Sequence, residues 1–182
     1  MKISMLHVAV SALLLSSMAD IGLAENTGRA REDSRAVTPT AVTTGGCGAL
    51  TKINYKSDDN IDYFTSSSSF VDVPNSTVTF GQGGTTSGCV IVTFTAEAFA
   101  PSERLLQIRA ILENSVVAAP GNVQFSGDDD EDSNGRWARS HAFTFIFPSV
   151  APGLHNVRMQ FRSPDIFGRV FIHKHTVVVQ HR

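Results

Sequence analysis

The sequence is poor in the residues and motifs that carry most enzyme chemistry. It has two cysteines among 182 residues, which excludes a dense disulfide framework or a cysteine-rich metal site. It has no Gly-x-Ser-x-Gly motif and no phosphate-binding loop with its lysine. The formal net charge is only −2, so the composition gives no reason to expect nucleic acid as a partner. These absences favour a non-catalytic protein over an enzyme.

Long apolar runs are absent after the first 24 residues, so the one at the start stands out. Lys2 precedes a mostly apolar stretch, residues 3–18, and Gly22 and Ala24 place small residues at the −3 and −1 positions of a cleavage site. This is the pattern of a secretory signal peptide, and the stretch is too short for a membrane span. We therefore expect residues 1–24 to be removed and a protein that begins near Glu25 to be secreted or exported to the periplasm, with no membrane span.

Cys47 and Cys89 both follow the predicted signal peptide. In an oxidising compartment an isolated pair is most simply a disulfide. Neither cysteine lies in a Cys-x-x-Cys motif or beside a recognisable catalytic partner, which disfavours a reactive thiol. We expect a Cys47–Cys89 bond that ties the entry segment of the domain to the start of a strand.

Residues 25–44 are polar and lack apolar periodicity, so we expect a flexible leader there. From residue 45 to residue 182 short apolar segments alternate with turns rich in Gly, Pro, Asn, Asp and Ser. Apolar residues in these segments recur every two positions, which is typical of strands. The sequence predicts an all-β protein with a single antiparallel β-sandwich, jelly-roll or immunoglobulin-like, of about nine strands over residues 45–182. The expected strands are 50–56, 69–73, 77–80, 90–98, 105–113, 122–125, 141–147, 155–162 and 170–180.

The alternation is informative in two of these segments. In residues 155–162, Val157, Met159 and Phe161 alternate with polar side chains, as expected when one strand face is in the core and the other in water. In residues 141–147, three phenylalanines alternate with Ala, Thr and Ile, so both faces are apolar. Such a strand is either central and covered on both faces, or it lines a contact with a partner.

The sharpest local motif is Asp-Glu-Asp-Ser-Asn-Gly at residues 130–135. It resembles the first half of an EF-hand calcium loop, in which alternate acidic or amide side chains point at one centre and a glycine permits the turn. On that resemblance Asp130, Asp132, Asn134 and the Arg136 carbonyl would be calcium ligands. The twelfth position, which should be a bidentate Glu, is a His, and no helix pattern flanks the loop. The alternative is a solvated acidic turn.

A second candidate is the run His173-Lys174-His175. On a regular strand both imidazoles would project from the same face, a spacing used for zinc or copper. A third ligand would have to come from elsewhere, and the alternative is a pair of half-buried histidines with hydrogen-bonded rings. The candidate third ligands for this histidine pair are His141, His155 and His181. A secreted metal-dependent hydrolase that uses His173 and His175, or the acidic loop, is the alternative function.

Charge is unevenly distributed along the chain. Residues 128–132 are five acids in a row, whereas residues 136–182 hold seven Lys or Arg and one acid, Asp165. This asymmetry either steers an anionic ligand or is paired within the fold. Trp137 follows the acidic run directly and, if exposed, would form part of a sugar-binding platform; a single Trp is more often a core or rim residue.

The function that these observations favour is an exported, non-catalytic binding or structural β-sandwich. We expect no catalytic residues, and calcium at the acidic loop is the one candidate cofactor. The partner would be an unidentified extracellular ligand or a second copy of the chain. The secreted metal-dependent hydrolase stays open as the alternative.

Overall fold

The fold was analysed in a computed structural model, which describes residues 46–60, 63–101, 104–127, 138–165 and 168–182. These residues form eleven strands and no helix, so none of them lies in a helix that could cross a membrane. All eleven strands belong to the unit Thr44–Arg182. The strands are β1 (Lys52–Asp58), β2 (Tyr63–Thr65), β3 (Val71–Asp72), β4 (Val78–Gln82), β5 (Gly88–Phe99), β6 (Leu106–Leu112), β7 (Val116–Val117), β8 (Val123–Ser126), β9 (Arg139–Val150), β10 (Gly153–Arg162) and β11 (Val170–His181).

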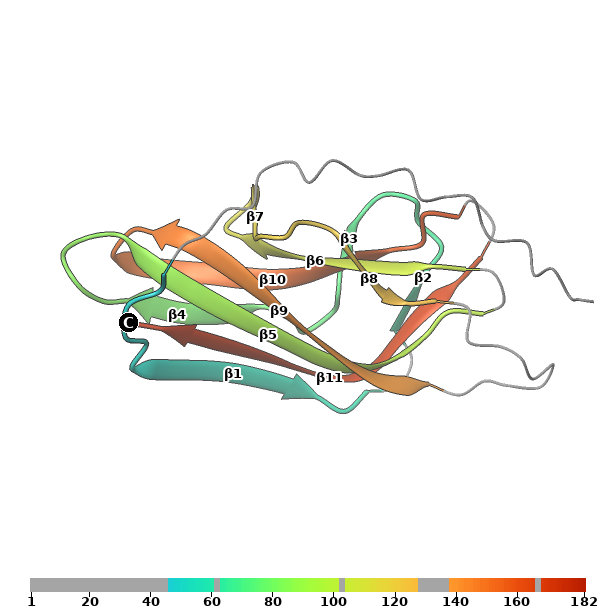
Figure 1. Ribbon diagram of the computed structural model, residues 1–182. Helices are drawn as coiled ribbons and strands as arrows, with labels where there is room; N and C mark the ends of the chain where they lie inside the picture. The colour runs from blue at the N-terminus through green and yellow to red at the C-terminus, as the bar shows by residue number, and fades with distance from the viewer. Residues whose placement is uncertain (1–45, 61–62, 102–103, 128–137, 166–167) are drawn as a thin grey trace, which may run out of the picture. The chain divides into compact units, whose positions relative to one another are not determined.

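The strands pair in two antiparallel sheets (Figure 1). Sheet A has the order β1-β11-β5-β9, with β2 also on β11; sheet B has the order β3-β10-β6-β7, with β4 also on β10 and β8 also on β6. When β1 with β2, β3 with β4, and β7 with β8 are each counted as one interrupted strand, the first strand pairs with the last, the second with the second to last, and so on. This doubled-back pairing is that of a jelly roll. The predicted antiparallel β-sandwich is therefore confirmed.

The core lies between the sheets and follows from the alternation of apolar residues along the long strands. Val90, Val92 and Phe94 of β5 are fully buried, and Val157 and Met159 of β10 are fully buried on the other side of the core. Each large side chain buried in this way contributes roughly 1.5–3 kcal/mol. The polar residues between them face outward, so both outer faces of the sandwich are defined by the same period of two.

All nine predicted strands are present. Two further strands, β2 and β7, were not predicted from the sequence, because each is only two or three residues long, too short for an alternating pattern to be recognised. The predicted faces of β10 are also confirmed, since Val157, Met159 and Phe161 are at most 1% exposed.

The two-sided apolar strand is β9, and it is not central in its sheet. It is the last strand in the order of sheet A, and Ile146 on its outward face is 38% exposed. Its free edge is held at one point, where the backbone groups of Ile146 and Ala119 exchange hydrogen bonds of 2.9 and 3.0 Å. The placement in the middle of a sheet was therefore wrong, and the second interpretation, a contact with a partner, still stands as a prediction.

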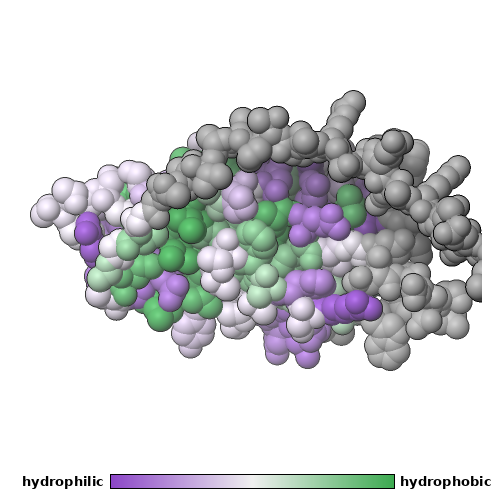
Figure 2. All heavy atoms as spheres, viewed as in Figure 1, coloured by the Kyte–Doolittle hydropathy of each residue, from purple (hydrophilic) through white to green (hydrophobic). Residues whose placement is uncertain are grey.

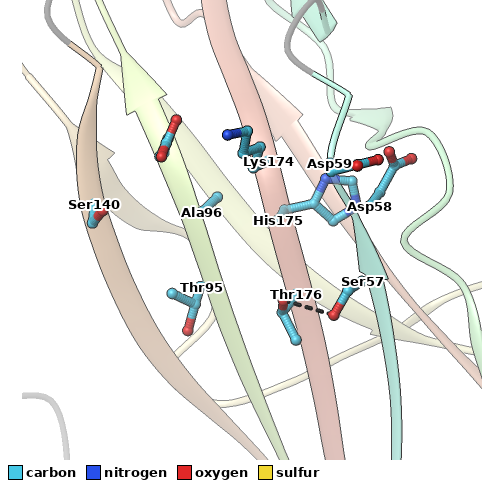
Figure 3. A pocket seen from close by; sticks show the side chains of 10 residues that line it. Ser57, Asp58, Asp59, Thr95, Ala96, Ser140, Lys174, His175 and Thr176 are labelled. Carbon is cyan, nitrogen blue, oxygen red and sulfur yellow. Dashed lines mark hydrogen bonds between the residues drawn. The ribbon is translucent and has the colours of Figure 1, made fainter.

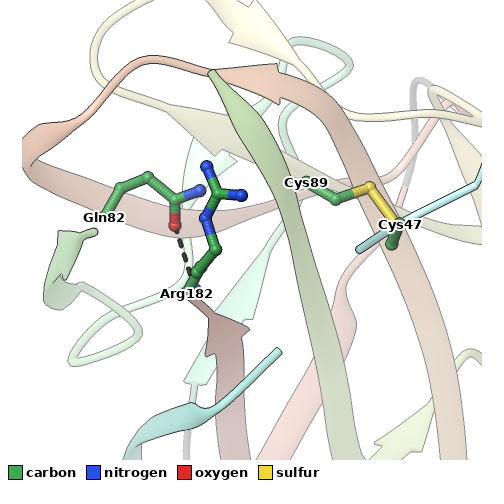
Figure 4. The surroundings of a disulfide bond; sticks show 4 residues. All are labelled: Cys47, Gln82, Cys89 and Arg182. Carbon is green, nitrogen blue, oxygen red and sulfur yellow. Dashed lines mark hydrogen bonds between the residues drawn. A yellow bond between two sulfur atoms is a disulfide. The ribbon is translucent and has the colours of Figure 1, made fainter. Parts of the chain in front are cut away.

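The disulfide Cys47–Cys89 is present and joins the entry segment to the beginning of β5 (Figure 4). Nearby, the last residue of the chain is tied to the loop after β4. The Arg182 backbone N–H donates to Gln82 Oε1 at 3.2 Å, and Arg182 Nη2 donates to the Thr86 carbonyl at 2.9 Å. Gly84 in this loop has a φ of 90°, which only glycine adopts without strain.

Candidate functional site

The outer face of sheet A spans four strands, β1, β11, β5 and β9. Side chains on this face line up in rows because the register of the strands aligns their outward positions. Ile53 and Tyr55 of β1 are 63% and 72% exposed, among the most exposed large hydrophobic side chains in the described part of the chain. Three rows cross the sheet in the order β1, β11, β5, β9: Ile53, Gln180, Ile91 and Ile146; Tyr55, Val178, Thr93 and Thr144; Ser57, Thr176, Thr95 and Ala142.

The character of this face changes from one end to the other. Hydrophobic side chains gather over the half of the sheet that contains the end of β11, and hydrophilic side chains gather toward the opposite end (Figure 2). At that opposite end Phe64 of β2 is 50% exposed and lies beside Phe171 of β11. The hydroxyl groups in the middle pair across strands: Thr93 with Thr144 at 3.2 Å, and Ser57 with Thr176 at 2.9 Å. The paired side chains are short, so none of them projects far from the sheet between Tyr55 and the polar end.

A groove of about 500 Å³ lies at the polar end of the face (Figure 3). Its lining combines hydroxyl groups with charges of both signs, namely carboxylates and one ammonium group. Such groups can both donate and accept hydrogen bonds with a polyhydroxylated ligand. The lining residues come from β1 and the turn after it (Ser57, Asp58, Asp59), β5 (Thr95, Ala96, Glu97), β9 (Ser140) and β11 (Lys174, His175, Thr176).

Asp58, at the end of β1, is held by three donors. Its carboxylate accepts hydrogen bonds from the backbone N–H of Asn60 at 2.9 Å, from Tyr63 Oη at 2.9 Å and from Asn75 Nδ2 at 2.7 Å. These bonds lower the pKa of the carboxyl, the Asn60 N–H first and then Asn75 and Tyr63. Asp58 is therefore a fixed, ionised wall of the groove.

His175 lies behind the groove and is turned into the core. It is 3% exposed, its ring packs against those of Phe94 and Tyr63, and neither ring nitrogen makes a well-aligned hydrogen bond with a described residue. Burial lowers the pKa of His175, and the nearby Asp58 carboxylate only partly opposes that effect. The imidazole is therefore neutral at pH 7.

The prediction that His173 and His175 share a face was wrong. The pairing of β11 with β5 shifts register between Ile172 and His175, so an irregularity falls inside the His-Lys-His run. His173 stays on the side of Phe171, whose ring it contacts edge-on, whereas His175 points inward. The two imidazoles thus lie on opposite faces of the sheet.

The other histidines each have separate surroundings. His141 packs against Phe125, His155 Nδ1 lies 3.0 Å from Glu113 Oε1, and His181 Nε2 lies 2.7 Å from Asn54 Oδ1. Within the described ranges, no group of three or more His, Cys, Asp or Glu side chains could hold a metal ion. The hydrolase alternative therefore has no metal-ligand set in this part of the chain.

The predicted calcium ligands Asp130, Asp132, Asn134 and Arg136 lie outside the described residues, and so does Trp137. In chain order they fall between the end of β8 and the start of β9. Ser140 of β9 lines the groove, three positions after Trp137.

Sequence reasoning did not single out the residues that make the face and the groove. Tyr55 and Lys174 lie on predicted strands. Alternation alone predicts an outward side chain at Tyr55 but not at Lys174. That they share one face with Thr93 and Glu97 depends on strand order and register, which no local pattern reveals.

No family model and no curated protein matches the chain. Among solved structures, the dimeric latent PorU from Porphyromonas gingivalis is similar over 76% of this chain and 14% of its own, with 16% identity and a TM-score of 0.46. The C-terminal CBM6 of LamC, a marine laminarinase from Zobellia galactanivorans, is similar over 69% of this chain and 98% of its own, with 12% identity and a TM-score of 0.35. The match spans only 14% of the length of the PorU chain.

Proposed function

We propose that the protein is an exported, non-catalytic binding module that holds a neutral glycan chain on the outer face of sheet A. The observation that carries the proposal is the continuity of this face, on which exposed Tyr55 leads over paired hydroxyl groups into the polar groove. The disulfide Cys47–Cys89 supports an oxidising compartment outside the cytosol.

The chemistry of the face suits a sugar polymer better than a folded protein. A pyranose ring has an apolar face of C–H groups, which packs on an aromatic ring, and a rim of hydroxyls that donate and accept hydrogen bonds. Tyr55 offers the ring, and Glu97, Lys174 and Thr95 offer hydrogen-bonding groups. A stable protein interface would need about 800 Å² per partner with an apolar centre. The large hydrophobics exposed on sheet A are Ile53, Tyr55, Phe64 and Ile146, and Phe64 is separated from the others by the polar groove.

Affinity electrophoresis tests this proposal directly. The protein, purified after export, would be run through native gels that contain soluble neutral glycans, namely β-glucans, xylan and galactomannan. We expect at least one glycan to retard the wild type and Tyr55→Ala to lose most of that retardation. Leu154→Ala is the matched control, since Leu154 is 76% exposed but lies on β10 of the other sheet.

Two outcomes would overturn the proposal. One is the absence of retardation by every neutral glycan. The other is equal retardation of the wild type and Tyr55→Ala. Light scattering on the same samples tests whether the face binds a second copy of the chain. A wild-type dimer that becomes a monomer in Tyr55→Ala would assign the face to such self-association.

Export by a signal peptide belongs to the same proposal and has its own measurement. We expect N-terminal sequencing of the exported protein to begin near Glu25, after the small residues Gly22 and Ala24. An exported protein that still carries residues 1–24 would contradict cleavage.

Calcium binding at Asp130, Asp132, Asn134 and the Arg136 carbonyl is a separate proposal, supported by the motif and by its position in the chain just before the groove-lining strand. A ligand that binds only the folded state raises its melting temperature. We expect millimolar calcium to raise the melting temperature of the wild type and not that of the Asp130→Ala/Asp132→Ala variant. An identical melt in calcium and in chelator would refute this site.

A further inference from the structure

The outer face of sheet B has a different chemistry, dominated by arginine and glutamine. Arg158 and Arg162 stand on β10, and Arg109 on the neighbouring β6, directly opposite Gln160. The two β10 arginines are four positions apart, or roughly 13 Å at about 3.3 Å per residue. The three guanidinium groups therefore form a triangle on one flat surface.

Each of these arginines is anchored through its Nε. Arg109 Nε donates to Gln160 Oε1 at 2.9 Å, and Arg162 Nε donates to Gln107 Oε1 at 2.9 Å. Arg158 Nε lies 2.9 Å from Asp72 Oδ1 as a close ion pair without hydrogen-bond alignment.

The anchors leave the outer nitrogens available. Arg162 Nη1 donates to the Ser68 carbonyl, and Arg158 Nη1 to the Glu113 carbonyl. Within the described ranges, Nη2 of both residues and both Nη atoms of Arg109 have no hydrogen-bond partner. The guanidinium groups are thus held in position before any ligand arrives, which lowers the entropic cost of binding.

Phe70 supports two of the arginines without neutralising them. The Arg109 and Arg162 guanidinium carbons lie 4.1 and 4.6 Å from the centre of its ring. Such cation–π contacts stabilise a cation while its charge stays uncompensated. Burial, and then the charges of Arg162 and Arg158, lower the pKa of Arg109, so the arginines sense one another.

Among the described residues, the arginines outnumber the carboxylates paired with them. In that part of the chain Asp72, beside Arg158, is the carboxylate paired with an arginine of this surface. Glu113, at the rim, has its Oε1 bound to His155 Nδ1 at 3.0 Å. The described part of this surface is cationic, in a chain whose net charge is −2.

We propose that Arg109, Arg158 and Arg162 form a second binding site, on the face opposite the glycan face, for a linear polysaccharide that carries carboxylate groups. A guanidinium group matches a carboxylate through two parallel N–H···O bonds. A polymer with regularly repeated carboxylates engages several arginines at once, an advantage that a single small anion lacks.

Titration with polygalacturonate, a linear polymer with one carboxylate on each sugar, tests the site. We expect binding at low salt that weakens as salt rises. Arg109→Gln and Arg162→Gln should each lower the affinity about tenfold. Arg169→Gln removes an equal charge from a residue that stacks on Phe64 in sheet A, and it should leave the affinity unchanged. Unchanged melting temperatures would show that the variants fold.

Arg109→Lys and Arg162→Lys separate charge from geometry. They keep the charge but lose the guanidinium fork, so we expect binding weaker than that of the wild type. Tyr55→Ala should bind polygalacturonate as the wild type does, which makes this site independent of the proposed glycan face. The absence of binding at low salt, or an equal loss in Arg169→Gln, would overturn the proposal. Binding to vesicles of anionic lipid but not to polygalacturonate would assign the surface to a membrane instead.

Discussion

The two outer faces of the sandwich come from the same alternation of residues, yet they have opposite chemistry. The middle of the outer face of sheet A carries short hydroxyl groups that pair across strands, as in Thr93–Thr144. On sheet B the outward side chains are long, and Gln160 links Arg109 of one strand to Asp72 of another. The length of the outward side chains therefore decides whether a sheet face is a surface of short side chains or a network of charged side chains joined by hydrogen bonds.

This difference has a consequence for binding. Short side chains that satisfy each other leave an apolar and hydroxylated surface, which suits a neutral ligand. Long side chains that are anchored by one atom hold their remaining donors outward, which suits an anion. The two faces can therefore be changed separately, as long as the core between them keeps both sheets in place.

The largest effect is expected from the layer that both faces share. Phe94 is fully buried and contacts Phe125 of sheet B at 5.4 Å between ring centres. We expect Phe94→Ala to lower the free energy of unfolding by about 3–5 kcal/mol, because it removes apolar contacts and leaves a cavity. Urea denaturation measures this. Thr93→Ala, at the next residue but on the outer face, is the control and should cost under about 1 kcal/mol. Equal costs would mean that the alternation does not separate core from face.

The next largest effect is expected from the disulfide bond at one end of sheet A. The Cys47–Cys89 bond closes a loop with a sequence separation of 42. We expect the Cys47→Ala/Cys89→Ala variant to lose about 2–4 kcal/mol of unfolding free energy, chiefly because the unfolded chain gains freedom. Thermal and urea melts would report the loss. Binding to both faces should survive in the folded variant, since neither cysteine lies on them; loss of binding on one face alone would contradict this.

The third effect is the pH dependence of stability that comes from His175, which is buried behind the groove. The folded state holds His175 neutral with a lowered pKa, so below about pH 6.5 the unfolded chain binds a proton that the folded protein does not. Stability should be greatest above pH 6.5 and should fall, by at most about 1.4 kcal/mol per pH unit, as the pH decreases towards the lowered pKa. The charged groups near the imidazole are Asp58 and Lys56.

Melts between pH 7.5 and pH 4.5 would measure this dependence, and His175→Leu should flatten it. His173→Asn is the control and should leave it as in the wild type. The contribution of Asp58 is separate in pH, because its pKa is lowered from 3.8 and its stabilisation is lost only below that value. A slope that persists in His175→Leu would assign the effect to another group.

The smallest effect sharpens the contrast between the faces. Asp72→Asn removes the carboxylate that is paired with Arg158 and keeps an oxygen that can accept from Gln160 Nε2. Because the ion pair is exposed, we expect stability to change by less than about 1 kcal/mol. Affinity for polygalacturonate should rise about two- to fivefold, while retention by neutral glycans stays the same. Calorimetric titration would detect the gain, and a weaker affinity would show that Asp72 positions Arg158 for the ligand.

Much of the fold follows from local sequence pattern. The segment 155–162 predicted a strand with Val157, Met159 and Phe161 inward, and that is how β10 is built. The pairing of Cys47 with Cys89 followed from composition alone. Alternation reports strands and their faces because each side chain's direction is fixed by its immediate neighbours along the backbone.

What the sequence could not reveal depends on residues far apart in the chain. The irregularity in β11 turns His175 into the core, and it exists only in the pairing of β11 with β5. Register brings Tyr55 into line with Thr93, and sheet order places Arg109 beside the arginines of β10. The sequence by itself determined the nine predicted strands and the disulfide. The tertiary structure decided which side chains share each outer face, because register and strand order are set by long-range pairing and by the packing of a shared core.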